Sequence, residues 1–195
     1  SAVGGVVNAI TPHESQRESP ISGTHGHVGA DTGSANGQAG TNASVLHDIG
    51  RLLVWAGSGT RRTGDYTTPE GTVENSATRL SNGRAGVAYL GDHLFASGGF
   101  QVEDGRHGIP FAGEFEGRGE EEPGTPEEIE LASRRQVGRF DAGIRNLPTG
   151  VIEGFSVVFN VIDYQHTELE TVDSVENVGT VFDNRAYVLR AEVNQ

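Results

Sequence analysis

The alternation of side-chain types from Ser81 to Glu103 places the strongest limit on what this chain can fold into. Small or apolar residues alternate with polar or small ones up to a turn at 90–93, and the alternation then resumes. The positions that share the apolar phase are Gly83, Ala85, Val87, Tyr89, Leu94, Ala96, Gly98, Phe100 and Val102. A period of two is the mark of a β-strand with two different faces. The stretch therefore predicts a β-hairpin with one apolar face.

The same unit repeats along the chain, and its connections alternate between short and long. We expect eight strands, at residues 24–32, 38–46, 51–66, 81–90, 94–103, 133–145, 154–170 and 181–193. Short turns are expected at 46–50, 90–93 and 146–150, and long polar loops at 66–79, 105–130 and 171–179. If neighbouring strands pair, every short turn lies at one rim of the sheet and every long loop at the other.

This asymmetry is typical of outer-membrane barrels, whose periplasmic turns are short and whose extracellular loops are long. The chain has 29 glycines and only 34% hydrophobic residues, which suits a barrel wall better than a thick globular core. We therefore predict an all-β fold, an antiparallel up-and-down transmembrane β-barrel of which the chain forms a partial wall of about eight strands. Two other arrangements stay open: an eight-stranded barrel closed on itself, and a soluble β-sandwich in which a second sheet covers the apolar faces.

Composition excludes several classes of protein. The chain has no cysteine, so it is neither a disulfide-stapled module nor a thiolate metal site. Its net charge is −13 and all 14 of its basic residues are arginines, which disfavours binding to nucleic-acid phosphates. No apolar run is long enough for a membrane-spanning helix. Since there is also no methionine, we expect Ser1 to belong to a processed chain or to a piece of a longer one.

Residues 2–10 read Ala-Val-Gly-Gly-Val-Val-Asn-Ala-Ile, a compact apolar strand with a glycine pair. This stretch resembles the strand that closes the plug domain of TonB-dependent outer-membrane receptors, just before their barrel begins. Stretches at 61–66, 105–110 and 163–168 are similar to strand ends in the first part of such a barrel. The resemblance implies two parts: residues 1–20 as the end of the plug domain with its linker, and residues 21–195 as the N-terminal part of the β-barrel. The TonB box, most of the plug and the later strands are missing, so the resemblance implies a fragment of a receptor.

The family has a barrel of about 22 strands with a plugged lumen, in the outer membrane of a Gram-negative bacterium. The resemblance implies energy-coupled uptake: the receptor binds a scarce nutrient outside, and the TonB complex pulls on the plug to open a path inward. The implied partners are this energy-transducing complex, outer-membrane lipid and a small-molecule or metal-complex substrate, without a cofactor. Siderophore-bound iron, zinc or copper ions, cobalamin and oligosaccharides all stay open as substrates.

His25 and His27 lie two residues apart in the first predicted strand, so they project from the same face, and Asp31 lies further along it. Two imidazoles and a carboxylate can bind a divalent metal ion, which makes these residues candidates for a metal site. The competing interpretation is that they form hydrogen bonds to a plug inside the barrel. A histidine pair in a strand does not decide between the two without a further ligand.

A second group of candidates lies near the upper strand ends and consists of Asp104, His107, Glu114, His166 and Glu168. Imidazoles and carboxylates at such positions can bind a cationic metal complex, so we predict a ligand-binding role for them. The alternative is a solvated rim without a ligand. We also expect a group of arginines to pair with lipid-headgroup phosphates or with acids of the loops, at Arg61, Arg62, Arg134 and Arg135.

The sequence carries no support for catalysis. It has no Gly-x-Ser-x-Gly elbow, no phosphate-binding glycine loop leading into a helix and no His-Glu-x-x-His pattern, so we do not expect an enzyme. The alternative to transport is a barrel that does not transport, or a structural or interaction subunit. A gene that continues on both sides, with a TonB box and a terminal aromatic residue, would favour the receptor.

Overall fold

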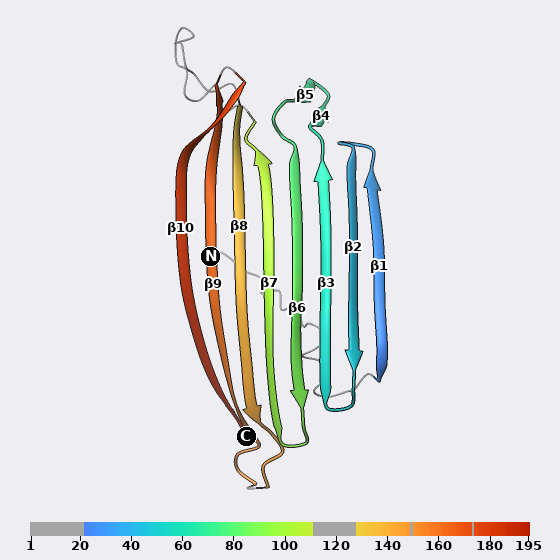
Figure 1. Cartoon of the computed structure of the whole chain (residues 1–195), viewed down its shortest axis with the longest axis vertical. Coiled ribbons are helices and arrows are strands. Elements are labelled where there is room, and N and C mark those ends of the chain that lie inside the picture. The colour runs from blue at the N-terminus through green and yellow to red at the C-terminus, as the bar shows by residue number, and fades with distance from the viewer. Residues whose placement is uncertain (1–21, 111–127, 149, 173) are drawn as a thin grey trace, which may run out of the picture.

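The computed structural model describes residues 22–110, 128–148, 150–172 and 174–195, most of which lie in β-strands (Figure 1). In chain order the strands are β1 (Gly23–Gly33), β2 (Gln38–Asp48), β3 (Leu52–Thr63), β4 (Tyr66–Thr68), β5 (Gly71–Val73), β6 (Thr78–Leu90), β7 (Leu94–Gly108), β8 (Glu128–Ile144), β9 (Gly154–Val172) and β10 (Val175–Asn194). Within these ranges there is no helix long and apolar enough to cross a membrane.

Eight of the strands form one sheet in the order β1-β2-β3-β6-β7-β8-β9-β10, and β4 and β5 form a separate hairpin. Each neighbouring pair in the large sheet is antiparallel. The prediction of an all-β, up-and-down sheet of eight strands is therefore confirmed. The sheet is open over the described residues, because β1 pairs only with β2 and β10 only with β9 (Figure 1). The eight strands thus do not close on themselves.

The three predicted short turns lie at one end of the sheet, and the β4–β5 hairpin, the end of β7 and the start of β8 lie at the other (Figure 1). The prediction of a long loop at 171–179 is wrong. There β9 continues to Val172, β10 starts at Val175, and the register shifts by one residue between Val178 and Val181. Such a β-bulge bends its strand. The connection between β9 and β10 is therefore short, although the predicted pattern requires a long one at this end of the sheet.

The β4–β5 hairpin is an element that the sequence analysis missed, inside the predicted loop 66–79. The Asp65 carboxylate stabilises its base, because Oδ1 accepts hydrogen bonds from the backbone N–H groups of Ser76 (2.7 Å) and Ala77 (2.9 Å). The hydroxyls of Thr63 and Thr78 are also bonded, 3.0 Å apart. The bonds to Asp65 satisfy backbone N–H groups just beyond the point where the hydrogen-bonded pairing of β3 with β6 ends.

The strand register divides the sheet into two faces of different chemistry. We call one of them the apolar belt: exposed large side chains that all share a face over the half of the sheet next to the short turns. Its members are Val28, Val45, Leu52, Val54, Val87, Tyr89, Leu94, Phe100, Phe140, Ile144, Phe155, Phe159, Tyr187, Leu189 and Val193. Large contiguous exposed apolar surfaces mark contact with another apolar phase.

The opposite face, which we call the polar face, carries mostly polar side chains in the same register. They include His25, His27, Asp31, Asn42, Arg61, Asn82, Arg84, Gln101, Glu103, His107, Arg135, Arg139, Asn160, Tyr164, His166 and Glu168. Trp55 also belongs here, and its ring extends over Gly86 of the neighbouring β6 to Gly99 of β7. An added Cβ would collide with the ring at Gly86 and would lie 3.3 Å from it at Gly99. The few buried side chains near the short turns, among them Leu53 and Phe95, share this face.

Candidate functional site

The second group of sequence candidates is divided between the two faces of the sheet. His107 on β7 and His166 and Glu168 on β9 lie on the polar face, whereas Asp104 lies on the opposite one. The reason is the period of two, since an odd separation such as that between Asp104 and His107 turns the two side chains to opposite faces. Glu114 lies outside the described residues. The structure therefore gathers three of these five candidates on one surface.

His107 and Glu168 lie in the same row of the register, with Leu131 of β8 between them. Two strand spacings of about 4.8 Å put their backbones roughly 10 Å apart. Side chains at that spacing line a common surface without direct contact. Both side chains can therefore contact one bound ligand.

His166 is the centre of a small aromatic cluster on the polar face. Its ring centroid lies 5.8 Å from that of Tyr164 and 4.6 Å from that of Phe182 on β10. His166 is directly opposite Phe182 in the register. Aromatic rings with a polar edge favour ligands that have both apolar and hydrogen-bonding parts. This cluster is the part of the polar face best suited to hold an organic ligand.

The structure does not bring His25, His27 and Asp31 together as a metal centre. The two histidines share a face as predicted, but His25 Nε2 donates a hydrogen bond to the carbonyl of Ser22 at 3.0 Å. The Asp31 carboxylate accepts a bond from Gln38 Nε2 at 2.7 Å and lies 3.6 Å from the Arg61 guanidinium. No group of three metal-ligating side chains occurs in the part of the chain that the structure describes.

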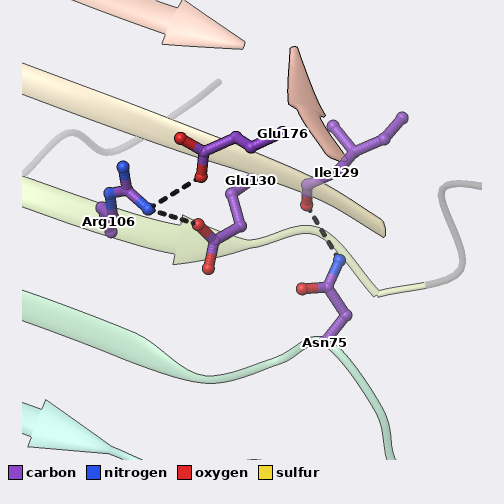
Figure 2. Close-up of polar contacts among 5 residues, drawn as sticks. All are labelled: Asn75, Arg106, Ile129, Glu130 and Glu176. Atoms are coloured by element: carbon purple, nitrogen blue, oxygen red, sulfur yellow. Dashed lines mark hydrogen bonds and ion pairs between the residues drawn. The ribbon is translucent and has the colours of Figure 1, made fainter. Parts of the chain in front are cut away.

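A band of charged side chains above the apolar belt was not predicted as a unit. On the face of the sheet that carries the belt, Arg134 lies 3.7 Å from Asp104. On the same face Arg106 lies 3.1 Å from both Glu130 and Glu176 (Figure 2). Further along the band, Arg185 pairs with Asp163. The signal was available in the sequence of β7, where the apolar phase up to Val102 gives way to Asp104 and Arg106 at the same period of two.

The upper rim is fixed by one asparagine as well as by ion pairs. Asn75 precedes β6, and its side-chain amide donates to the carbonyls of Ile109 (3.0 Å) and Ile129 (2.8 Å), the second of which is drawn in Figure 2. Asn75 has a φ of 54°, a left-handed conformation that asparagine tolerates better than most residues. The two ends of the β7–β8 connection are thus attached to the β5–β6 connection.

No family model matches the sequence, and a search of curated proteins finds no match either. Function is therefore inferred from the geometry of this chain. That geometry consists of one face that is apolar near the short turns and charged above, and one polar face with histidines, arginines and aromatic rings.

Proposed function

We propose that this chain is part of the wall of an outer-membrane β-barrel of the TonB-dependent receptor type, which takes up a scarce nutrient without changing it chemically. The observation that carries the proposal is the apolar belt on one face of an up-and-down antiparallel sheet. The resemblance of residues 2–10 to the end of a receptor plug supports the family. The localisation that follows is the outer membrane of a Gram-negative bacterium.

The apolar phase of β7 has the length of a transmembrane strand. It runs from Leu94, a member of the belt, to the half-buried Val102, which is about 26 Å along the strand at roughly 3.3 Å per residue. A tilted transmembrane β-strand has about 9–11 residues. Leu189 is 71% exposed and Val28 is 83% exposed, although burying a side chain of this kind stabilises a protein by about 1.5–3 kcal/mol. Lipid chains would supply that burial.

The alternatives to a membrane wall fit the belt less well. A soluble β-sandwich needs a second sheet over the belt, and the described residues contribute only the two short strands β4 and β5 outside the large sheet.

The unpaired sides of β1 and β10 would cost free energy in lipid, because backbone groups there have no water to bond. Further strands of the same barrel, which we propose as partners for both edges, would satisfy those groups.

In this proposal the polar face lines the lumen. The plug, of which residues 1–20 would be the end, then contacts His25, His27 and their neighbours, and the TonB complex acts on the plug. His107, His166 and Glu168 are the proposed ligand contacts on the wall, and a metal–siderophore complex or another metal compound is the proposed substrate. Asp104 is not among them, since it projects from the side of the sheet that carries the apolar belt.

A cysteine-labelling experiment tests the membrane placement. The chain has no cysteine, so single substitutions give unambiguous labels. In the full-length protein in native outer membranes, we expect Phe100→Cys to resist a water-soluble maleimide, and its neighbour Gln101→Cys to react once the barrel interior is accessible. Equal rates at the two sites would overturn the membrane wall.

An uptake experiment tests the transport function separately. Cells that lack the gene are compared with complemented cells for uptake of iron–siderophore, cobalamin, zinc, copper and oligosaccharide substrates, each with and without the TonB complex. We expect one substrate to depend on both the gene and the complex. If labelling places the belt in lipid but no substrate shows this dependence, the chain belongs to a barrel that does not transport.

A further inference from the structure

Three arginines are direct neighbours across three adjacent strands. Arg62 on β3 is opposite Arg79 on β6, and Arg79 is opposite Arg106 on β7. All three are exposed on the side of the sheet that carries the apolar belt. Like charges directly opposite one another destabilise an antiparallel pair. A sheet that carries three in a row therefore requires compensating negative charge.

The acids of the described residues compensate only one end of this row. Arg106 lies between Glu130 and Glu176, each at 3.1 Å (Figure 2). Arg62 and Arg79 have no acidic side chain within ion-pair distance among those residues. The adjacent Arg61 does not help, because it lies on the polar face beside Asp31. Positive charge is thus concentrated at Arg62 and Arg79.

A pocket of about 450 Å³ opens beside the row. The small residues Ser81 and Ala132 line it together with Arg79, Arg106 and Arg134, whereas Arg62 lies outside the lining. Asp104 also lines the pocket, but Arg134 lies 3.7 Å from its carboxylate. Guanidinium groups bind phosphate through paired charge-assisted hydrogen bonds, and the pocket is large enough to accept a phosphate with the sugar or glycerol that carries it.

The position of the row indicates where the anion comes from. On β7 Arg106 lies four residues beyond Val102, where the apolar phase of the strand ends, which is about 13 Å along the strand. Because the strands of such barrels are tilted, the height of Arg106 above the belt is smaller than this distance along the strand. Arginine side chains also extend toward a membrane surface. We propose that Arg62 and Arg79, with the pocket beside them, bind the phosphate groups of an outer-leaflet lipid headgroup. This inference rests on the membrane placement proposed above.

The test uses the full-length protein in detergent with lipid A, a diphosphorylated glycolipid, as the probe. The variant is the double substitution Arg62→Gln with Arg79→Gln. Its matched control is Arg84→Gln, which removes an arginine from the same strand β6 but from the polar face. Lipid A retained by the protein is counted by native mass spectrometry. Because a hydrogen bond to a charged group contributes about 1.5–3 kcal/mol, we expect at least a roughly tenfold loss of affinity in the double variant and none in the control.

A second measurement, of thermal unfolding, separates a lipid site from internal ion pairs and from a general anion site. Without lipid A the double variant should unfold at the same temperature as the parent or higher, since like-charge repulsion is removed. A lower unfolding temperature would overturn the proposal, because the arginines would then pair with acids of the protein itself. Equal stabilisation of the parent by inorganic phosphate at the same phosphate concentration would also overturn it in favour of a general anion site. If lipid A binds as expected but a water-soluble maleimide labels Phe100→Cys rapidly, the proposal of a membrane wall is overturned. The proposal that Arg62 and Arg79 bind phosphate is then still supported.

Discussion

Arg106 on β7 and Glu176 on β10 form an ion pair at 3.1 Å although 70 residues and two intervening strands separate them (Figure 2). The bulge between Val178 and Val181 explains the contact, because it bends the upper end of β10 back over the sheet. The same guanidinium nitrogen also lies 3.1 Å from Glu130 on β8. One side chain therefore joins the upper ends of three strands.

We expect Arg106→Gln to loosen the upper end of β10 and to change global stability little. Each of the two pairs is partly exposed, and exposed pairs contribute only about 0.2–1 kcal/mol. Hydrogen exchange should accelerate at backbone amides of 175–180 and stay unchanged near 187–193. Arg51→Gln, which removes an exposed pair with Asp92 at the opposite rim, is the control. Unchanged exchange at 175–180 would mean that the bulge alone holds this end.

We expect Gly86→Ala to destabilise the sheet by about 1–3 kcal/mol, the usual cost of overpacking. A Cβ at this position would meet the Trp55 ring and lie 2.7 Å from the Gly98 carbonyl oxygen. Trp55 is the only tryptophan in the chain, so its fluorescence follows the change directly during urea unfolding.

Gly98→Ala is the matched control for that substitution, because a Cβ at Gly98 has no atom within 4 Å. Its midpoint of unfolding should stay within experimental error of the parent. Equal losses in the two variants would show that the sheet responds to any lost glycine and not to the contact with Trp55.

We expect Phe159→Arg to reduce the fraction of protein that folds into lipid vesicles. Phe159 lies near the middle of the apolar belt on β9, opposite Phe140 and Leu189. An arginine on the lipid face near the bilayer midplane costs about 2–4 kcal/mol. Ile162→Arg, three residues further on the polar face and opposite Val137 and Ala186, should fold as the parent does. The folded fraction is read from the shift in gel mobility between heated and unheated samples, and equal losses at 159 and 162 would contradict a two-faced wall.

The strands and their order could be predicted because alternation at period two is strong in 81–103 and in 154–161. Trp55 could not be assigned to a face from its apolar neighbours, and only pairing with β6 assigns it. The β4–β5 hairpin was missed because its three-residue strands carry no periodic signal. The β9–β10 end was predicted as a loop because its residues are polar, although polar residues suit a strand that extends beyond the belt.

The candidate site was harder to predict because it depends on two kinds of information. The face on which a residue lies relative to others of the same strand can be predicted from the sequence, because side chains alternate, and this separates Asp104 from His107. The register between strands cannot be predicted in the same way, and a shift of one residue moves every side chain to the other face. The row of Arg62, Arg79 and Arg106 depends on that register over three strands, so no inspection of the individual strands would have found it.

Ligand binding on the polar face should depend on His166. We expect His166→Ala to raise the concentration of nutrient at which uptake is half-maximal by about tenfold or more, since a lost hydrogen bond with stacking is worth about 1.5 kcal/mol or more. The ring of His166 lies between Tyr164 and Phe182, so its removal also opens the aromatic cluster. Uptake is measured in cells that express the full-length variant at parental levels.

His47→Ala is the control for this prediction. His47 projects from the other face, where its Nδ1 is 2.7 Å from the hydroxyl of Thr24 near the short turns, so its loss should leave the uptake curve unchanged. His166→Phe keeps the aromatic packing but removes the hydrogen-bonding edge, and its uptake should fall between those of the parent and His166→Ala. If His166→Phe matches the parent, the cluster supports the fold of the wall and the ligand binds elsewhere.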